Sequence, residues 1–321
     1  MKIAVLDRCT VTNGDVSLAP LEALGEVRYF DMLPPAELSA AIGDAEAVIV
    51  NKARITAEVM DACPHLRFVG LFATGYNNID VAAADERGIV VCNVPGYSTA
   101  SVAQHTIALM LHFACRADDY ACSVAEGEWV KSKAFSYFKY PTSELCGKTL
   151  GLLGYGAIAR AVARVALAFG MTVLASSRTH TEGRDGEVRF VDSDTLFAQS
   201  DYLSLHCPLT PETERAVNAR TLSLMKPSAV LINTARGGVT DEAAVADALN
   251  EGRLRGAGID VLCEEPMPDD HVFLRTKNCF VTPHVAWGSL EARTRLVDMV
   301  ADNLIAYRDG HPKNCVGRFG K

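Results

Sequence analysis

The chain of 321 residues contains 49% hydrophobic and 22% charged residues, which is ordinary globular composition and excludes a disordered or collagen-like chain. At about 150 residues per domain, this length predicts two domains. The net charge of -8 arises without long runs of one sign, so no nucleic-acid-binding or anionic-membrane surface is indicated.

The ten cysteines and the first residues of the chain bear on its compartment. No two cysteines have Cys-x-x-Cys spacing, so no zinc knuckle or thioredoxin-type pair is predicted. No histidine, aspartate or glutamate cluster has ligand spacing either, so no bound metal is expected. The chain reaches Asp7 before an apolar stretch develops, so no signal peptide is expected. Together these features predict a cytoplasmic protein with reduced thiols.

Short apolar runs recur along the chain, separated by intervals that leave room for a helix. Continuous runs of this kind are typical of strands buried on both faces of a parallel sheet. The first set of predicted strands is 3–6, 27–30, 47–50, 68–71 and 89–92. The second set is 149–153, 171–175, 202–205, 229–233, 256–260 and 279–282. The pattern predicts an α/β protein with two doubly wound parallel-sheet domains.

The uncharged stretch 88–115 is long enough to cross a membrane, but its composition argues against a span. It contains prolines, glycines and hydroxyl-bearing residues, as well as Gln104 and His105. We therefore predict a buried strand, a loop and a core helix in this region.

An aromatic-rich segment, residues 118–148, separates the two sets of strands. Its aromatic residues include Trp129, Phe135, Tyr137, Phe138 and Tyr140. We interpret it as an arm that packs either on a partner subunit, as a dimerisation arm of a homodimer, or on the chain itself. A helical apolar pattern over 291–309 predicts a return to the first domain. The first domain would then comprise 1–100 and 287–321, with 101–286 inserted as the second.

A glycine-rich turn, Gly154-Tyr155-Gly156-Ala157-Ile158-Ala159, follows the first strand of the second set and opens a helical pattern. Gly154 allows a tight turn, and Gly156 allows a pyrophosphate to approach the backbone at the helix N-terminus. Strand, turn and helix follow in the order of a dinucleotide-binding fingerprint, so the sequence predicts NAD or NADP as cofactor. A plain structural turn is the alternative.

The next predicted strand leads into Ser176-Ser177-Arg178. An NAD enzyme normally places an acidic residue here for the ribose hydroxyl, and none is present. A small hydroxyl followed by arginine favours NADP, because the arginine would accommodate the 2′-phosphate. A solvent-exposed arginine at a strand end is the alternative.

Three further predicted strand ends carry Arg236, Glu265 and His284. An arginine can bind a carboxylate bidentately and polarise a carbonyl, and a histidine can donate a proton near neutral pH. A nearby glutamate would stabilise the protonated imidazole. Because ligands bind at the carboxyl ends of strands in open α/β sheets, these residues suit the reduction of a keto acid. A core histidine, a capping arginine and an exposed turn are the structural alternatives.

Five segments together resemble the D-isomer-specific 2-hydroxyacid dehydrogenase family over essentially the whole chain. They are Gly154-x-Gly156-x-x-Ala159, 206–213, Asn233-x-x-Arg236-Gly237, Asp260-Val261-x-x-x-Glu265-Pro266 and Pro283-His284-x-Ala286-Trp287. The resemblance implies a Rossmann dinucleotide-binding domain inserted into a flavodoxin-like substrate domain.

The resemblance also implies residue roles. Arg236 would bind the substrate, His284 would be the acid/base and Glu265 its partner, while Asp260 would hold the nicotinamide amide. The implied cofactor contacts are Thr106, Gly154, Tyr155, Gly156, Ala157, Ile158, Ser176, Ser177, Arg178, His206, Cys207, Pro208, Thr213, Thr234, Ala235, Asp260, His284 and Ala286. The implied substrate contacts are Lys52, Ala73, Thr74, Gly75, Arg236 and His284.

Within the family, Gln104, Asn51-Lys52 and the loop 73–78 resemble glycerate dehydrogenase-like members, and Glu265 argues against the formate dehydrogenase branch. We therefore predict reversible reduction of hydroxypyruvate or glyoxylate to D-glycerate or glycolate. One alternative is another 2-hydroxyacid, such as 3-phosphoglycerate, which would need a further basic pocket, D-lactate or a bulkier acid. The other is a non-catalytic NAD(H)-sensing protein of the corepressor type.

Overall fold

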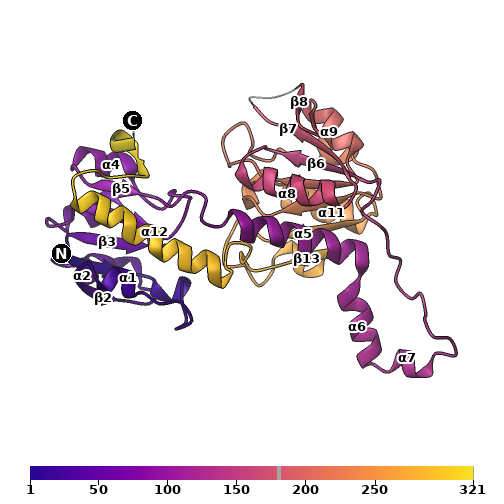
Figure 1. Ribbon diagram of the computed structural model, residues 1–321, viewed down its shortest axis with the longest axis horizontal. Coiled ribbons are helices and arrows are strands. Elements are labelled where there is room, and N and C mark those ends of the chain that lie inside the picture. The colour runs from indigo at the N-terminus through magenta and orange to yellow at the C-terminus, as the bar shows by residue number, and fades with distance from the viewer. Residues whose placement is uncertain (179–181, 321) are drawn as a thin grey trace. The chain divides into compact units, whose positions relative to one another are not determined.

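The apolar runs of the sequence form two separate sheets in the computed structural model, which describes residues 1–178 and 182–320. The chain divides into two units, one made of Met1–Ser98 and Trp287–Lys321, the other of Thr99–Ala286. We call them unit 1 and unit 2; both are drawn in Figure 1. Each pairs a mainly parallel sheet with helices, which confirms the predicted α/β class.

Unit 1 contains a six-stranded sheet in the order β14-β5-β4-β3-β1-β2. Its strands are β1 (Lys2–Val5), β2 (Glu26–Tyr29), β3 (Ala47–Val50), β4 (Phe68–Leu71), β5 (Val90–Cys92) and β14 (Cys315–Val316). The first five are parallel to their neighbours, and β14 runs antiparallel to β5. The order of the parallel strands is that of a flavodoxin-like sheet.

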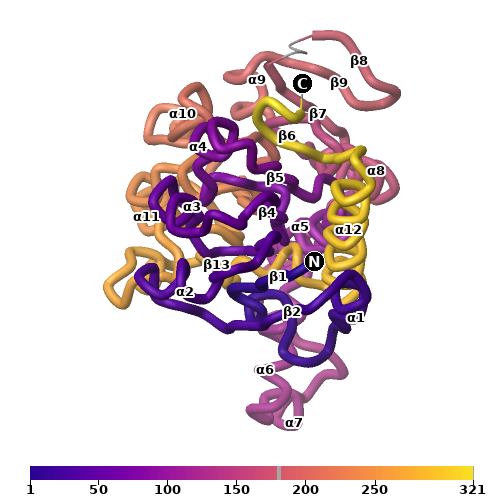
Figure 2. Tube along the Cα trace, turned by 90° about the vertical axis from the view of Figure 1, so that its left-hand side faces the viewer, coloured from indigo at the N-terminus to yellow at the C-terminus, as the bar shows by residue number. Residues whose placement is uncertain are grey.

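Helices cover both faces of this sheet. They are α1 (Ala19–Glu22), α2 (Leu38–Ile42), α3 (Ala57–Asp61), α4 (Val81–Glu86) and α12 (Leu290–Arg308), with 3-10 turns at Arg8–Thr10, Pro35–Glu37 and Gly317–Gly320. The Ser289 side chain caps α12 by accepting from the Ala292 N–H. The long helix packs beside α1 in Figure 2 and buries Leu296, Val300 and Leu304 against the sheet.

Unit 2 contains an eight-stranded sheet in the order β13-β12-β11-β10-β6-β7-β9-β8. Its strands are β6 (Thr149–Leu153), β7 (Thr172–Ser176), β8 (Arg184–Asp185), β9 (Val188–Phe190), β10 (Tyr202–Leu205), β11 (Val230–Asn233), β12 (Gly256–Ile259) and β13 (Cys279–Val281). Among the described strands of this sheet, β8 alone runs antiparallel to its neighbour, in a hairpin with β9. From β9 to β13, the order is that of a Rossmann sheet with one added strand.

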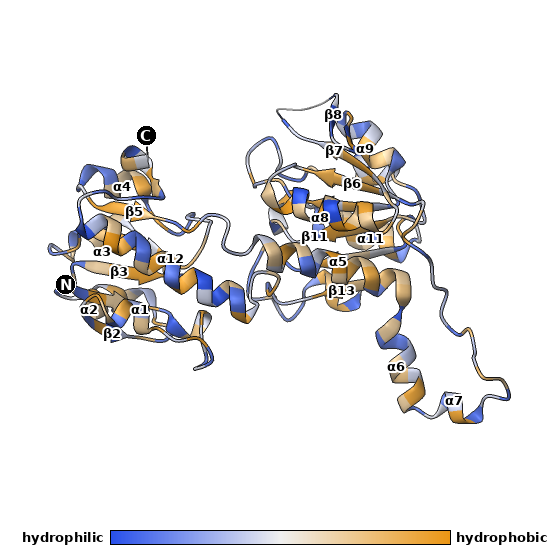
Figure 3. Ribbon diagram, viewed as in Figure 1, coloured by the Kyte–Doolittle hydropathy of each residue, from blue (hydrophilic) through white to orange (hydrophobic). Residues whose placement is uncertain are grey.

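The helices of unit 2, apart from α6 and α7, form a layer on each face of its sheet. They are α5 (Thr99–Cys115), α6 (Ala117–Ala125), α7 (Glu128–Lys131), α8 (Ala157–Ala168), α9 (Ser193–Gln199), α10 (Ala219–Leu224) and α11 (Glu242–Asn250), with 3-10 turns at Gly237–Val239 and Val272–Arg275. Helices α5 and α8 share one apolar core, while α9, α10 and α11 line the other. The strands between the two layers are strongly apolar in Figure 3. Within the described residues, no helix is long and apolar enough to span a membrane.

The aromatic-rich segment forms a projection from unit 2. In Figure 1, α6 and α7 extend away from the sheet, and an extended stretch leads back to β6. Tyr137 and Tyr140 pack against Tyr120 in α6, so aromatic contacts within the segment stabilise its shape. By contrast, Phe135 and Phe138 are each 91% exposed. The segment therefore has an internally packed aromatic side and an exposed apolar side.

Candidate active site

The predicted cofactor and catalytic residues of unit 2 gather at one edge of its sheet. Strands β6, β10, β11, β12 and β13 are consecutive parallel neighbours, so their carboxyl ends lie at the same edge. The glycine turn follows β6, and the segments carrying Arg236, Glu265 and His284 follow the last three of these strands. The topology therefore brings the segments together, as expected for ligand sites in open α/β sheets.

His284 and Glu265 form a direct pair. The Nδ1 atom of His284 lies 2.7 Å from Oε2 of Glu265, and the Leu262 N–H donates to the other carboxylate oxygen at 3.0 Å. Both side chains are about one-third exposed, so His284 is not a buried core histidine. Because a carboxylate accepts hydrogen bonds, the pair places a proton on Nδ1 and leaves Nε2 for a reacting group.

Arg236 is exposed on a turn that the neighbouring buried residue Asn233 holds in shape. The Asn233 side chain accepts from the Ala235 N–H and donates to the Arg236 carbonyl oxygen, both at 3.0 Å. The next residue, Gly237, lies so close to the Glu265 loop that an added Cβ would be 2.0 Å from the Leu262 carbonyl carbon. Only glycine permits this approach, which brings the arginine turn against the glutamate loop.

Asp260 organises the segment that carries His284. Its buried carboxylate accepts from the Val285 and Ala286 N–H groups at 2.9 and 3.0 Å, and from the Thr282 hydroxyl at 2.6 Å. The His284 N–H donates to the Asp260 carbonyl oxygen at 2.8 Å. His284 has a φ of +53°, a left-handed conformation that costs a non-glycine residue about 1–2 kcal/mol. The surrounding hydrogen bonds hold it there.

The glycine turn fits a dinucleotide pyrophosphate. Gly154 has a φ of +92°, and an added Cβ would lie 2.6 Å from the Cys207 nitrogen, so only glycine fits. Gly156 caps α8, is exposed, and has open space where its Cβ would be. Ala159 is fully buried where the helix packs on the sheet. A bound phosphate could thus contact backbone N–H groups at the N-terminus of α8.

The other fingerprint residues divide by exposure. Ala157 is exposed in the first turn of α8, and Ile158 is half-buried against the core. The Tyr155 hydroxyl donates to Asp185 at 3.1 Å, and its ring meets Phe190 edge-on. Burial and the Asp185 carboxylate raise the pKa of this phenol.

The end of β7 carries the three residues expected to distinguish NAD from NADP. Ser176 is buried, and its carbonyl oxygen accepts from the Gly154 N–H at 2.8 Å, which ties the strand end to the glycine turn. Ser177 is half-buried and Arg178 is exposed. Arg178 thus follows the strand end that is tied to the glycine turn. This is the position in the chain expected for a residue that binds a ribose phosphate.

The loop from β10 to α10 contains His206, Cys207, Pro208 and Thr213. The Thr213 hydroxyl donates to the Pro208 carbonyl oxygen at 2.6 Å and accepts from the Thr210 N–H, which folds the loop on itself. Burial raises the pKa of the Cys207 thiol to about 11 and lowers that of His206 to about 4. Both side chains are therefore neutral near pH 7.

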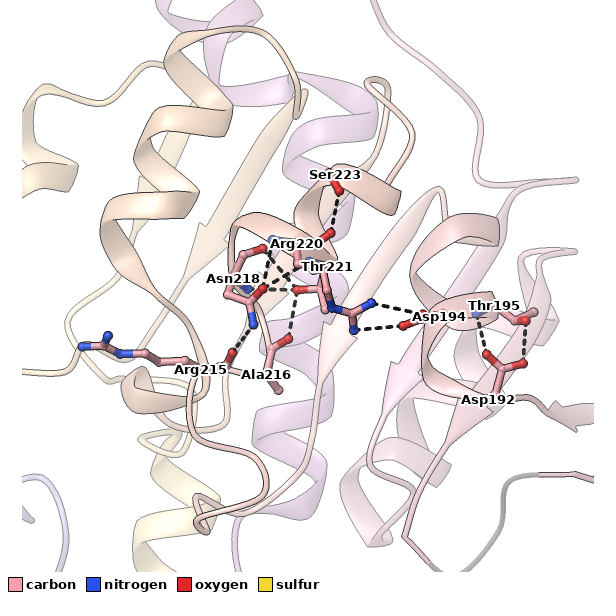
Figure 4. A network of polar contacts seen from close by, with 9 residues as sticks. All are labelled: Asp192, Asp194, Thr195, Arg215, Ala216, Asn218, Arg220, Thr221 and Ser223. Atoms are coloured by element: carbon pink, nitrogen blue, oxygen red, sulfur yellow. Dashed lines mark hydrogen bonds and ion pairs between the residues drawn. The ribbon is translucent and has the colours of Figure 1, made fainter.

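The far end of this loop is anchored by the polar network of Figure 4. The Asn218 side chain accepts from the backbone N–H groups of Arg220 and Thr221 and donates to the Arg215 carbonyl oxygen. Arg220 also pairs with Asp194 through two hydrogen bonds of 3.1 and 3.0 Å. These contacts fix where α10 begins and hence where the loop with the predicted cofactor residues ends.

Two predicted cofactor residues meet across α5 and β11. The hydroxyls of Thr106 and Thr234 lie 3.1 Å apart and are both buried. Thr106 also donates to the Val102 carbonyl oxygen at 2.9 Å, so its hydroxyl accepts from Thr234. Ala235, the next residue after Thr234, is half-buried, and Ala286 is buried. The helix thus lines the site together with the strand ends.

The predicted substrate residues of unit 1 lie on two loops after β3 and β4. Asp7, which is 1% exposed, accepts from the N–H groups of Asn51, Lys52 and Ala53 at 2.5–3.0 Å. The Lys52 side chain is exposed. The turn thus has an ordered backbone and an exposed ammonium group.

The second loop of unit 1 contains Ala73, Thr74 and Gly75. The Thr74 hydroxyl donates to the Val94 carbonyl oxygen at 2.8 Å, and Asn93 donates to the Thr74 carbonyl oxygen at 2.7 Å. Thr74 is exposed, while Ala73 and Gly75 are half-buried. These contacts fix the loop through the hydroxyl and the carbonyl oxygen of Thr74.

Sequence reasoning missed three residues that shape these loops, namely Asp7, Asn93 and His105. Each is polar and lies directly after a predicted strand or within a predicted core helix, which is the signal that could have found it. Their partners are distant in sequence: the Asp7 contact with Ala53 spans 46 residues, and the His105 contact with Thr282 spans 177.

The comparisons with known proteins identify the family of the chain. The family model described as the D-isomer specific 2-hydroxyacid dehydrogenase NAD binding domain matches residues 107–286. The chain is 42% identical over 322 residues to a hydroxypyruvate reductase of Blautia hydrogenotrophica, covering 99% of this chain and 100% of the relative. It is 42% identical over 290 residues to a glycerate dehydrogenase of Methylorubrum extorquens, covering 90% of each chain.

A solved structure provides a third likeness. It is an NADPH-dependent glyoxylate/hydroxypyruvate reductase from Sinorhizobium meliloti in complex with NADP and malonate. The match has a TM-score of 0.83 and 34% identity, and covers 98% of this chain and 96% of that one. On the family model and the full-length likeness, this chain belongs to the D-isomer-specific 2-hydroxyacid dehydrogenase family and is an NAD(P)-dependent oxidoreductase.

Proposed function

We propose that this enzyme reduces hydroxypyruvate or glyoxylate with NAD(P)H, reversibly toward D-glycerate or glycolate. The observation that carries the proposal is the His284–Glu265 pair, whose Nδ1 and Oε2 atoms lie 2.7 Å apart. His284 follows β13 and Glu265 follows β12, and Arg236 follows β11, the next strand of the sheet. The names of the relatives at 42% identity, hydroxypyruvate reductase and glycerate dehydrogenase, support this choice of substrates.

The residues of the chain divide the chemistry among them. The bound nicotinamide would supply the hydride that reduces C2 of the ketoacid. His284 would protonate the developing alkoxide from Nε2, while Glu265 holds the proton on Nδ1 and stabilises the imidazolium. Arg236 would hold the substrate carboxylate and stabilise negative charge on the carbonyl oxygen. The reaction then needs no metal ion.

The loops of unit 1 would supply the remaining substrate contacts. The Thr74 hydroxyl and carbonyl oxygen make hydrogen bonds to Val94 and Asn93 within unit 1. We propose that the backbone N–H groups around Thr74 and Gly75 bind the substrate carboxylate. Lys52 would add positive charge from the turn that Asp7 orders. Asp260 would hold the nicotinamide amide through the carboxylate described above.

We propose NADP as the preferred cofactor, because Ser177 and Arg178 follow β7 where an acidic residue would select NAD. Replacing the arginine in an R178A variant should raise the KM for NADPH about tenfold or more, with little effect on NADH. An R189A variant, which removes an exposed arginine of β9, is the matched control. Equal KM values for NADPH in R178A and the parent would show that Arg178 is only a surface residue.

We also propose a homodimer in which the exposed side of the α6–α7 segment is covered by a second copy. Trp129, Phe135 and Phe138 are 51%, 91% and 91% exposed, and exposed apolar residues that lie together are typical of protein–protein contact surfaces. An F135S/F138S variant should sediment as a monomer, whereas M32S, at an exposed residue of unit 1, should sediment as the parent does. A monomeric parent chain would overturn this proposal.

The experiment that tests the function is a matrix of initial rates. Hydroxypyruvate, glyoxylate, pyruvate and phosphohydroxypyruvate are each assayed with NADH and NADPH, following loss of cofactor absorbance. Fastest turnover of hydroxypyruvate or glyoxylate is the expected result. Faster turnover of pyruvate or phosphohydroxypyruvate would overturn the substrate. The ten free cysteines of the chain suit a reducing, cytoplasmic setting, so the assay should contain a thiol reductant.

A further inference from the structure

One face of α5 contacts both ends of the segment that carries His284. The Ser101 hydroxyl donates to the Ala286 carbonyl oxygen at 2.6 Å, and Nε2 of His105 lies 3.0 Å from Oγ1 of Thr282. Residues four apart lie on the same face of a helix, one turn from each other. The helix therefore spans the segment 282–286, and His284 lies at the middle of that segment.

The hydrogen bonds from His105 have a defined direction. The Thr282 hydroxyl donates its single hydrogen to Oδ1 of Asp260 at 2.6 Å, so its oxygen must accept from His105. Nε2 of His105 therefore carries a proton, and it also lies 3.5 Å from the same carboxylate oxygen. The hydrogen-bond chain runs from His105 through Thr282 to a carboxylate that is 1% exposed.

Asp260 transmits this contact to His284. Its carboxylate accepts from the N–H groups of Val285 and Ala286, and its carbonyl oxygen accepts from the His284 N–H. His284 has a left-handed backbone that the neighbouring contacts must maintain. Without His105 the Thr282 hydroxyl could turn, which would weaken one of the three hydrogen bonds that fix the Asp260 carboxylate and so loosen the backbone of His284.

We infer that His105 is a positioning residue for proton transfer at His284, acting through Thr282 and Asp260. The residue lies in the first half of α5, one position before the cofactor-lining residue Thr106. Its role rests on the catalytic role proposed above for His284. It does not require His105 to touch the substrate or the cofactor.

Three variants on α5 separate positioning from simple packing. In H105L the ring is replaced by an apolar side chain that cannot donate to Thr282. In H105Q an amide nitrogen is kept in reach of the hydroxyl. H112L is the matched control, since His112 lies on the same helix and stacks on Phe280 of β13 at 4.1 Å, while its side-chain bond goes to Asp118.

Kinetics provide the first measurement. H105L should lose about 10–100-fold in kcat, the range seen when a partner that orients a functional side chain is removed. Its KM for the ketoacid and its Kd for NADPH, measured by fluorescence, should change less than about threefold. H105Q should recover most of the kcat, and H112L should match the parent. A T282V change, which removes the hydroxyl that donates to Asp260, should lower kcat at least as much as H105L, because it breaks the same chain at the carboxylate itself.

Amide hydrogen exchange provides a measurement that does not depend on turnover. The amides of 284–286 should exchange faster in H105L than in the parent, and as slowly as in the parent in H105Q and H112L. Unchanged exchange and kcat in H105L, or an equal loss of kcat in H112L, would overturn the inference. Retained turnover in a His284 variant would instead overturn the proposed role of His284, so the two failures are distinguishable.

Discussion

Glu265 connects His284 to the loop after β12 through its two carboxylate oxygens. One oxygen lies 2.7 Å from Nδ1 of His284, and the other accepts the Leu262 N–H at 3.0 Å. The carboxylate therefore cannot rotate without breaking one of these hydrogen bonds. The imidazole orientation is set by backbone geometry three residues away from the glutamate.

Replacing His284 by alanine should remove the acid/base while leaving the glycine turn intact. We expect kcat to fall by about 100- to 10,000-fold, the usual range for a lost general acid, with the NADPH Kd within about twofold. Steady-state rates and fluorescence titration measure the two quantities. H65A, at an exposed histidine of unit 1, is the control, and near-parental turnover in H284A would contradict the assignment.

A glutamine at Glu265 should be far from conservative. The Leu262 N–H would attract the amide oxygen, which turns the NH2 group toward Nδ1 of His284. Two donors would then face each other in the imidazolium form, so we expect kcat to fall by about 100-fold or more. The E264Q change alters an exposed neighbour and should have no effect. Similar kcat values for E265Q and E264Q would show that Glu265 does not support the imidazolium.

The two glycines of the glycine turn, Gly154 and Gly156, should respond differently to alanine. G154A places a Cβ 2.6 Å from a backbone nitrogen at a φ of +92°, so it should lower the Tm and the affinity for NADPH together. G156A meets no protein atom within 4 Å, so it should keep the parental Tm and lose only cofactor affinity. Differential scanning calorimetry and cofactor titration test the pair; unaltered NADPH affinity in G156A would argue against a pyrophosphate there.

His206 should make stability depend on pH. Burial lowers its pKa from 6.5 to about 4, so between these values the unfolded chain binds a proton that the folded chain does not. The stabilisation is complete above pH 6.5 and is lost as the pH falls toward 4, at most about 3 kcal/mol in all. Urea unfolding of the parent and H206Q between pH 4 and 7 measures it. Parallel pH profiles would show that His206 is not the source.

The strands were predictable because buried parallel strands are continuous apolar runs, and each predicted run forms a strand within one residue of its expected ends. The strands that were missed, β8, β9 and β14, are two or three residues long, and Arg184–Asp185 is fully polar. Such segments are too short for a periodicity to appear. Their pairing is determined by the neighbouring strand or turn.

The candidate site was partly predictable because its residues follow the strands that the apolar runs predict. Arg236, Glu265 and His284 follow strands whose order can be expected from the doubly wound topology, so their gathering at one edge follows. Asp7 and His105 act on loops that are distant in sequence, and no local pattern indicates such pairs. The direction of their hydrogen bonds appears only when the packed side chains are known.

The position of α12 in the sequence affects the order in which the chain can fold during synthesis. Unit 2 is continuous, whereas unit 1 has its covering helix at Leu290–Arg308, which supplies Leu296, Val300 and Leu304 to its core. A ribosome releases that helix only after the whole of unit 2. Until then the first sheet lacks the helix that buries much of one apolar face, so unit 2 can complete first, the reverse of the usual N-terminal-first order.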